Sequence, residues 1–190
     1  ISEGGAADIL ITTKLAWIEQ LKNSGLVDVY SQTPVARGRL ALAGPRESPL
    51  QIDMSKGFPT TQLIQQFGWE PAFVIGNPEY LFEGVFSKQA LRNLGASQDL
   101  EEYTLYIKSA EQMRELISKQ GMYGLFLYSS VLYRNDMRVF GLIPETAHQP
   151  IEYYAVVIAG ENMNEARRFI EYLKTDAAKA ILENTGFSTQ

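Results

Sequence analysis

Three short segments of the chain could hold an anion through groups at the start of a helix. Thr12 and Thr13 follow an apolar run. Glu83 and Gly84 come at the start of a segment whose apolar residues have helical spacing, and Ser109 begins another such segment at residues 109–113. The first N–H groups of a helix have no partner within it and lie at the positive end of its dipole, which suits an oxyanion. The same residue types also cap helices that bind nothing, and for each segment alone capping is the simpler interpretation.

Tyr128 is a further candidate because it ends an apolar run at residues 124–127. Its hydroxyl could donate a hydrogen bond to a ligand. The alternative is a core tyrosine whose hydroxyl lies at the rim of the protein interior, as is common for buried tyrosines. Taken alone, the residue type and its position favour the core role.

The remaining polar residues favour neither an enzyme nor a metal site. The chain has no cysteine, which excludes disulfides, thiolate metal sites and a cysteine nucleophile. Glu145, His148 and Glu152 are close in sequence, but one histidine with two carboxylates is a weak set of metal ligands. An acid–base catalyst built on Glu145 and His148 is a distant alternative, and phosphate-loop, dinucleotide-binding and serine-hydrolase motifs are absent from the sequence.

The charge and the lengths of the apolar runs argue against two kinds of environment, nucleic acid and the membrane interior. The net charge of −5, from 17 basic and 22 acidic residues, argues against a nucleic-acid partner, which requires a basic surface. No apolar run approaches the roughly 18 residues of a membrane helix, so we expect no membrane span. The chain begins ISEGGAAD, without the basic start of a signal peptide. A mature exported protein lacks that peptide as well, so the observation does not locate the protein.

Hydrophobic periodicity predicts strands that alternate with helices, a pattern typical of parallel sheets with helices on both faces. Strands are expected at residues 7–12, 39–43, 72–75, 104–107, 124–128, 139–142 and 154–158. Helices are expected at residues 14–22, 61–67, 84–93 and 164–184, from Ser109 onward, and briefly through Val131. Residues 45–60, punctuated by proline and glycine, are the best candidate linker. We expect Trp17 and Trp69 to be packing residues, with Trp17 on the apolar side of the first helix.

Several short motifs follow one another along nearly the whole chain. They are ADILITT followed by Trp17, a strand ending at Gly44-Pro45, the turn GNPEYLFEG, the helix FSKQAL, the segment IPETAHQPIEYYAV, and a closing helix at residues 169–187. Each motif alone has low specificity for any family, but the order and spacing of the motifs together are specific. They resemble the molybdate-binding proteins of bacterial ABC importers, a family of type II periplasmic binding proteins.

The resemblance implies a two-lobed protein that buries an oxyanion between its lobes and holds it with neutral donors. It also implies which positions supply those donors. Matched residue by residue, they are Thr12 and Thr13 after the first strand, Glu83 and Gly84 at the turn, Met113 at a second-lobe helix start, and the hydroxyl of Tyr128.

Two departures from the family's pattern bear on this interpretation. The family's first ~40 residues, with two serine ligands and the central strand of the first lobe, have no counterpart here, which predicts an N-terminally incomplete fold with a strand edge open to self-association. Glu83 stands where the family has a small residue. A carboxylate a few ångströms from a dianion repels it unless the carboxylate points away or is well solvated.

The sequence thus predicts an α/β, two-lobed type II periplasmic-binding-protein fold. The expected lobes are residues 1–45 with 154–190 and residues 46–145, joined by a crossing at 146–153. The expected function is capture of molybdate or tungstate in the periplasmic or extracellular space for an ABC-transporter permease, with lobe closure on binding and without catalysis, cofactor or metal ion. The alternative is a binding-protein-like sensor or interaction module that holds another small ligand or none.

Overall fold

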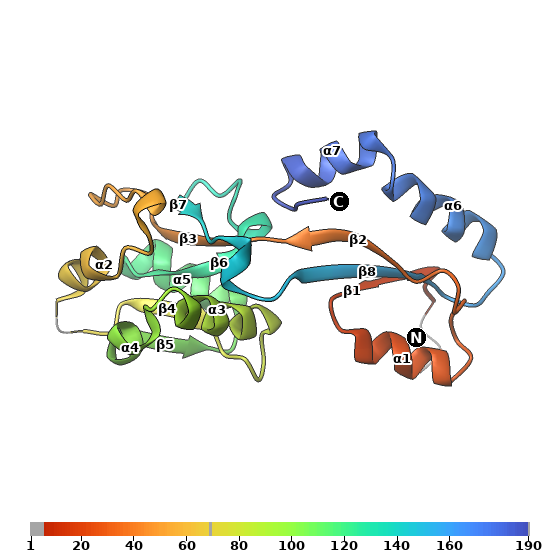
Figure 1. Ribbon diagram of the computed structural model, residues 1–190, viewed down its shortest axis with the longest axis horizontal. Coiled ribbons are helices and arrows are strands. Elements are labelled where there is room, and N and C mark those ends of the chain that lie inside the picture. The colour runs from red at the N-terminus through yellow and green to blue at the C-terminus, as the bar shows by residue number, and fades with distance from the viewer. Residues whose placement is uncertain (1–5, 69, 190) are drawn as a thin grey trace. The chain divides into compact units, whose positions relative to one another are not determined.

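A computed structural model describes residues 6–68 and 70–189, and Trp69 lies outside the described residues (Figure 1). The chain forms two units. Unit 1 consists of Ile1–Gly38 and Ile151–Gln190, and unit 2 consists of Arg39–Pro150. A discontinuous first unit and a continuous second one agree with the expected order of the lobes.

The boundaries of the units lie elsewhere than expected from the sequence. Residues 39–45 belong to unit 2, because Leu40 to Ala43 are completely buried within its sheet. Residues 146–150 also belong to unit 2. Two hydrogen bonds hold them there: Asn93 Nδ2 donates to the Ala147 carbonyl at 2.9 Å, and the Gln149 N–H donates to Gln89 Oε1 at 3.1 Å.

Unit 1 contains a three-stranded antiparallel sheet rather than the expected parallel one. Its strands are β1 (Ile9–Thr12), β8 (Ile151–Val157) and β2 (Thr33–Gly38), in the order β1-β8-β2. β8 pairs antiparallel with both neighbours, so the strand from the end of the chain is the central one. The parallel arrangement predicted from alternating strands and helices is therefore wrong for this unit.

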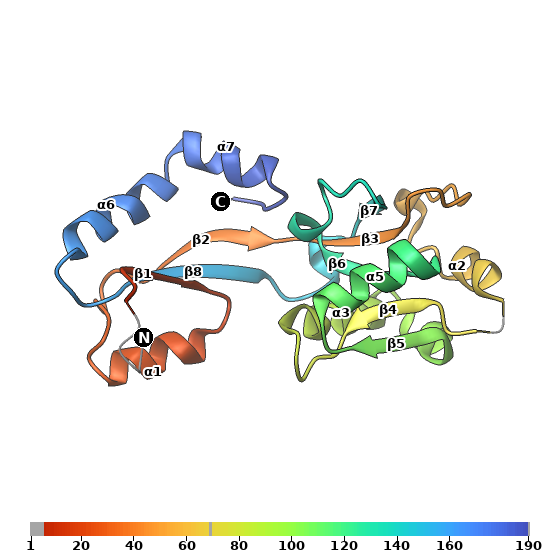
Figure 2. The ribbon, with the colours of Figure 1, turned by 180° about the vertical axis from the view of Figure 1, so that it is seen from behind.

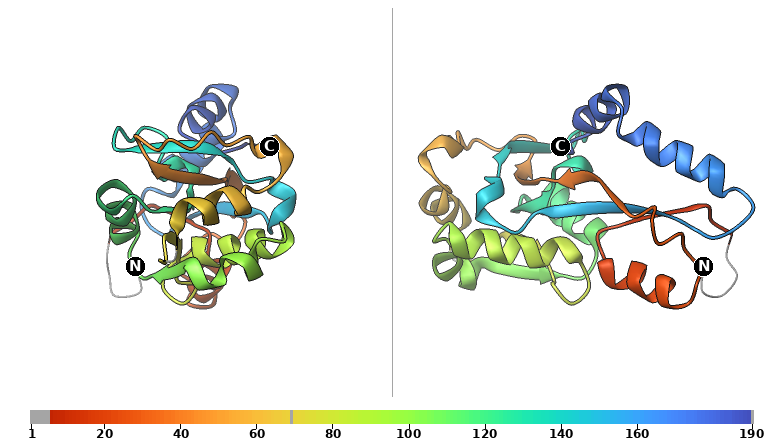
Figure 3. Two further views of the ribbon diagram at one scale, coloured as in Figure 1. Left: turned by 90° about the vertical axis from the view of Figure 1, so that its left-hand side faces the viewer. Right: turned by 45° about the vertical axis from the view of Figure 1, so that its right-hand side comes forward.

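Helices cover both faces of the unit 1 sheet (Figures 1 and 3). They are α1 (Leu15–Asn23), α6 (Met163–Leu173) and α7 (Asp176–Asn184). Ile18 and Leu21 of α1 pack with Val156 of β8, whereas Ala166 and Ile170 of α6 pack with the adjacent Val157. Successive side chains of a strand point to opposite faces, so α1 and α6 lie on opposite sides of the sheet.

Unit 2 contains a five-stranded mixed sheet. Its order is β5 (Thr104–Ile107), β4 (Phe73–Gly76), β6 (Tyr123–Leu127), β3 (Leu40–Pro45) and β7 (Met137–Leu142). β4 is parallel to both β5 and β6, whereas β3 is antiparallel to both β6 and β7. The predicted parallel arrangement holds for three neighbouring strands of this unit.

Unit 2 has four α-helices within its described residues. They are α2 (Thr60–Phe67), α3 (Phe82–Asn93), α4 (Ser97–Leu100) and α5 (Ala110–Gln120), with short 3₁₀ turns at Met54–Lys56, Glu101–Tyr103, Tyr128–Ser130 and Glu145–Ala147. Of these helices, α3 follows β4 and α5 follows β5. α3 lies in front of the sheet in Figure 1, and α5 lies in front of it when the molecule is seen from behind in Figure 2. The sheet is thus covered on both faces.

Three local expectations differ from the structure. β2 was not predicted, the single helix expected at residues 164–184 is divided between α6 and α7, and Trp17 is half exposed rather than packed. The break follows Leu173, where Thr175 begins α7 and its hydroxyl accepts a hydrogen bond from the Ala178 N–H at 3.3 Å. The Trp17 ring instead faces the ammonium group of Lys14, which lies 4.5 Å from the ring centroid.

Candidate functional site

The carboxyl ends of three neighbouring parallel strands meet at one edge of the unit 2 sheet. β4 lies between β5 and β6. α3 follows β4, α5 follows β5, and the turn Tyr128–Ser130 follows β6. The Asn77 N–H donates to the Ile107 carbonyl at 2.8 Å, which ties the end of β4 to the end of β5. Such edges are where parallel sheets bind ligands, because helix N-termini point free N–H groups outward.

Asn77 shapes the turn that leads into α3. Its carbonyl accepts hydrogen bonds from the N–H groups of Tyr80 and Leu81 at 3.0 and 2.8 Å. Its side-chain oxygen accepts one from the Glu79 N–H at 2.9 Å. The turn therefore has a fixed geometry, and α3 begins from a defined position above β4.

Gly84 brings the first turn of α3 into contact with the end of β4. A Cβ atom at Gly84 would lie 2.1 Å from the Gly76 carbonyl oxygen and 3.0 Å from the Pro78 nitrogen. Both neighbours are backbone atoms, so neither can move away cheaply. This predicted site residue is required for close packing of the backbone, which brings the N–H groups of the helix start to the sheet edge.

Glu83 is buried in the same turn, with 8% of its surface exposed. Burial raises the pKa of its carboxyl above the ordinary value, against the opposing effects of a hydrogen bond from its own N–H and of the nearby Arg114 guanidinium. The side chain is therefore largely shielded from water. The carboxyl lies at the N–H that the sequence resemblance assigns to an anion.

The start of α5 offers N–H groups of the same kind. Ser109 is the cap predicted from the sequence, and its hydroxyl accepts from the Gln112 N–H at 3.4 Å. Met113 is fully buried, and its N–H donates to the Ser109 carbonyl at 3.0 Å. The predicted donor at Met113 is thus already used within the helix. Ala110 and Glu111 occupy the positions whose N–H groups have no partner inside a helix.

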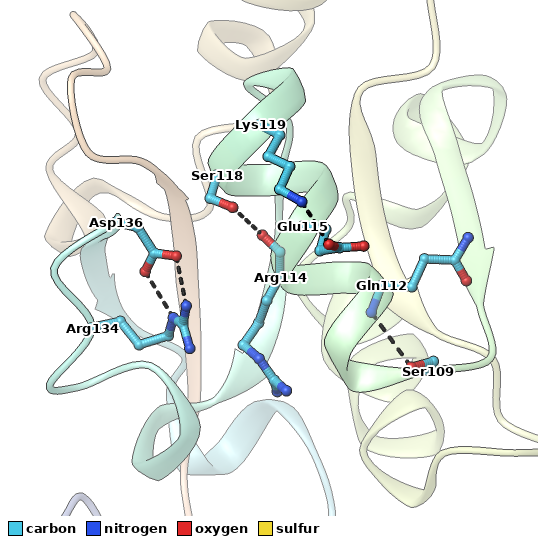
Figure 4. A network of polar contacts seen from close by, with 8 residues as sticks. All are labelled: Ser109, Gln112, Arg114, Glu115, Ser118, Lys119, Arg134 and Asp136. Atoms are coloured by element: carbon cyan, nitrogen blue, oxygen red, sulfur yellow. Dashed lines mark hydrogen bonds and ion pairs between the residues drawn. The ribbon is translucent and has the colours of Figure 1, made fainter.

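Arg114 is a charged residue at this edge that the sequence interpretation missed. Figure 4 shows its side chain beside α5, with the guanidinium outside all the drawn hydrogen bonds, whereas Arg134 and Asp136 form a bidentate pair at 2.6 and 2.8 Å. The hydrogen bond from Arg134 is the main cause of the lowered pKa of Asp136, and the Arg114 charge adds to it in a minor way. The same charge partly opposes the burial that raises the pKa of Glu83. Arg114 is the fifth residue of α5 and directly follows the predicted donor Met113, and this position was the signal available in the sequence.

Tyr128 lies directly after β6. Its N–H donates to the Arg39 carbonyl at 2.8 Å, and the Arg39 guanidinium lies over its ring, 5.0 Å from the centroid. The ring packs against the hydrophobic cluster that also contains Met113 and Leu81. The ends of β4, β5 and β6 therefore contribute side chains to one cluster, with Tyr128 at its margin.

Thr12 and Thr13 lie at the end of β1 in unit 1. Thr12 is buried, and its hydroxyl accepts a hydrogen bond from the Lys14 N–H at 3.1 Å, so it orders the entry to α1. That bond uses the oxygen as an acceptor and leaves its O–H able to donate. Thr13 is half-buried. Both remain predicted donors.

Two cavities in unit 1 were not predicted from the sequence. The larger, of about 460 Å³, lies between α6 and residues 28–33, which lead into β2. The smaller, of about 240 Å³, lies between β2, the end of α6 and Lys179 of α7. Three of their cations form ion pairs: Arg167 with Asp28 at 2.8 Å, Lys174 with Glu171 at 2.6 Å, and Arg37 with Glu152 at 3.1 Å. Paired charges attract an external anion weakly, and none of the predicted donors lines either cavity.

The three residues considered for a metal are divided between the units. Glu145 and His148 belong to unit 2, and Glu152 belongs to unit 1. Glu152 hydrogen-bonds to Arg37 and to the Tyr154 hydroxyl, and these bonds lower the pKa of its carboxyl. Within residues 6–68 and 70–189, no group of three or more His, Cys, Asp or Glu side chains could hold a metal ion.

A family model described as "Bacterial extracellular solute-binding protein" matches residues 1–188. The chain belongs to this family of extracellular solute-binding proteins. The match spans both units of this solute-binding protein. No helix in its described part is long and apolar enough to cross a membrane.

Individual relatives of this solute-binding protein confirm the resemblance seen in the motifs. Molybdate-binding protein ModA of Haemophilus influenzae is 22% identical over 100% of this chain and 74% of its own length. ModA of Escherichia coli is 24% identical over 99% of this chain and 72% of its own. Both relatives bind solutes, as their names state, and neither is named as an enzyme.

A solved structure shows the fold of this solute-binding protein. The substrate-binding domain of a putative molybdenum ABC transporter from Clostridium difficile superposes with a TM-score of 0.82 at 18% identity, covering 100% of this chain and 80% of that one. The type II periplasmic-binding-protein fold predicted from the sequence is confirmed.

Proposed function

We propose that this protein captures a tetrahedral oxyanion, molybdate or tungstate, and delivers it to the permease of an ABC importer. Family membership and the names of its relatives support the proposal. The observation that carries it is the meeting of three helical starts at the carboxyl ends of β5, β4 and β6. The alternative of a sensor or interaction module without such a ligand gains no support from these relatives.

The proposed donors in unit 2 are neutral. They are the Glu83 N–H in the first turn of α3, the N–H groups of Ala110 and Glu111 in α5, and the Tyr128 hydroxyl. The Gly84 N–H already donates to the Leu81 carbonyl at 3.0 Å. Oriented N–H groups stabilise an anion without a full positive charge, which permits tight binding on a protein of net charge −5. Molybdate and tungstate present the same arrangement of acceptor oxygens, so we assign the pair and not one of them. In unit 1 we retain Thr12 and Thr13 as proposed hydroxyl donors.

Titration calorimetry with molybdate, tungstate and sulfate tests the function directly. We expect saturable binding of molybdate and tungstate with one site per chain, and weaker binding of the smaller sulfate. The full chain, with both of its units, should be used. No binding of any of the three anions would exclude the proposal.

Removing the Tyr128 hydroxyl tests its role as a donor. Tyr128→Phe keeps the ring in its hydrophobic cluster and deletes one hydrogen bond to a charged ligand. Affinity for tungstate should fall about 10- to 100-fold, because a hydrogen bond to an ion contributes about 1.5–3 kcal/mol. Tyr30→Phe is the matched control, since Tyr30 is 95% exposed. Equal affinities of the two variants would remove Tyr128 from the site.

We further propose that the protein acts in the periplasmic or extracellular space, as its family name indicates. Its partners are then the oxyanion and the permease, and it needs no cofactor and catalyses no reaction. Transport assays in cells with and without the permease separate delivery from simple storage of the anion.

Self-association through the edge of β1 is a separate prediction. Within the part of the chain that the structure describes, β1 pairs with β8 on one side, and Ile11 is 46% exposed. An open edge with an apolar side chain favours pairing with a second copy. We expect sedimentation velocity to show a concentration-dependent dimer that Ile11→Lys abolishes. A monomer at every concentration would contradict this prediction.

A further inference from the structure

The carboxyl of Glu83 lies at the helix start that the proposed function assigns to the oxyanion. Glu83 is 8% exposed, sits in the first turn of α3, and interacts with its own backbone N–H. An anion that binds this turn needs the same kind of donor. The chain thus carries an acidic group of its own at the proposed anion site.

Two negative charges at one buried helix start disfavour each other. The cost is reduced when one of the two groups takes up a proton, as in buried carboxylate pairs. An ionised carboxylate only accepts hydrogen bonds, whereas a protonated carboxyl also donates through its O–H. Tungstate and molybdate dianions have only acceptors. A protonated Glu83 is therefore compatible with the bound dianion, and an ionised one is not.

We propose that the site takes up its oxyanion together with one proton, which resides on the Glu83 carboxyl. The inference rests on the proposed function and adds that Glu83 governs how the affinity for the oxyanion depends on pH. In the balanced step, a solvent proton forms an O–H bond with the Glu83 carboxylate, the dianion binds, and no other covalent bond changes. The protein without ligand releases that proton as the pH rises.

The elements packed against the start of α3 carry few ionisable side chains besides Glu83. β4 carries no ionisable side chain, and in β6 the Tyr123 hydroxyl is bonded to Ser48 at 2.6 Å. α4 contributes the exposed Asp99, and the turn Glu145–Ala147 contributes Glu145, followed by His148 beside Phe86. On α3 itself, Lys88 lies over the Tyr106 ring, 5.2 Å from its centroid. Arg114 of α5 is the cation that acts on the Glu83 carboxyl.

Proton uptake on binding is the decisive measurement. Tungstate is titrated into the full chain from about pH 6 to 8.5 in buffers of different ionisation enthalpy, which yields the number of protons taken up. We expect uptake to rise towards about one proton with increasing pH, while affinity falls by up to about tenfold per pH unit. Glu83→Gln keeps the shape of the side chain without the charge. This variant should show no linked uptake and bind tungstate at least about tenfold more tightly at the alkaline end.

Each result has a separate meaning. If wild type and Glu83→Gln both fail to bind tungstate, molybdate and sulfate, the proposed function fails. If wild type binds tungstate with the same proton uptake and pH dependence as Glu83→Gln, the function stands and the inference is overturned. A folded Glu83→Gln protein that loses binding also overturns it. Glu79→Gln, at an exposed position four residues earlier, should behave as wild type.

Stability without ligand provides a second measurement. Burial raises the pKa of Glu83 in the folded state, so the folded protein holds this proton more tightly than the unfolded chain does. The favourable contribution is complete at pH values below the pKa of the unfolded chain and is lost as the pH rises through the folded pKa. Relative to Glu83→Gln, wild type should therefore become less stable in urea as the pH rises from acid to neutral. A constant difference between the two proteins would overturn the inference.

Discussion

Gly84→Ala should lower the free energy of unfolding of unit 2 by about 3 kcal/mol and remove oxyanion binding. The new Cβ would lie 2.1 Å from the Gly76 carbonyl oxygen, a distance that backbone atoms can relieve only by moving α3 away from β4. That movement displaces the N–H groups in the first turn of the helix. Urea unfolding, together with hydrogen exchange at the amides of α3 and β4, measures the loss within this unit.

A glycine without neighbours supplies the control for Gly84→Ala. A Cβ at Gly160 would meet no atom within 4 Å, so Gly160→Ala should change stability by less than about 0.5 kcal/mol. If Gly84→Ala were as stable as Gly160→Ala and bound tungstate normally, close packing of α3 on β4 would not be required for the site.

Phe73→Ala is expected to be still more damaging, by about 3–5 kcal/mol. Phe73 opens β4 and is completely buried. Its ring lies between those of Phe58 and Phe67, with both centroids 6.3 Å away. Alanine would leave a cavity that three segments of unit 2 line, and their backbone positions prevent full collapse. Thermal or urea unfolding followed by circular dichroism measures the change.

Phe169→Ala is the matched control for Phe73→Ala. Phe169 of α6 is 47% exposed, so its removal should cost less than about 1 kcal/mol. A similar loss in both variants would show that the buried ring contributes no more than a surface one. The two units can unfold in separate steps, so both variants should be followed with probes in each unit.

Elements with a strong local signal could be predicted from the sequence. The residues of β4, β5 and β6 form short apolar runs bounded by turn residues. Ser109 is a typical N-cap residue and marks the start of α5. β2 was missed because it contains Pro34 and ends at Gly38, both poor strand formers. Pro34 is tolerated because β2 is an edge strand with a bulge between Pro34 and Ala36. Antiparallel pairing with β8 depends on residues more than 100 positions away, which local periodicity cannot encode.

The candidate site shows the same division between local and distant information. Gly84 and Tyr128 were found from their positions after strands, and the structure places each at the edge expected. The orientation of the Glu83 carboxyl could not be predicted, because it depends on how closely α3 approaches β4. Met113 has the right place in the sequence, but its N–H is used by Ser109 within the helix. Arg114 affects Glu83 only through the packing of α5, so no spacing rule reveals their proximity.

The central place of β8 in unit 1 constrains the order in which a growing chain can fold. The strands of unit 2 are all complete once Leu142 has been made, so this unit can fold while synthesis continues. Unit 1 has made β1 and β2 long before, but they do not pair with each other. Both must wait for β8, more than 110 residues after β2. During synthesis, the first unit to begin is therefore the last to form.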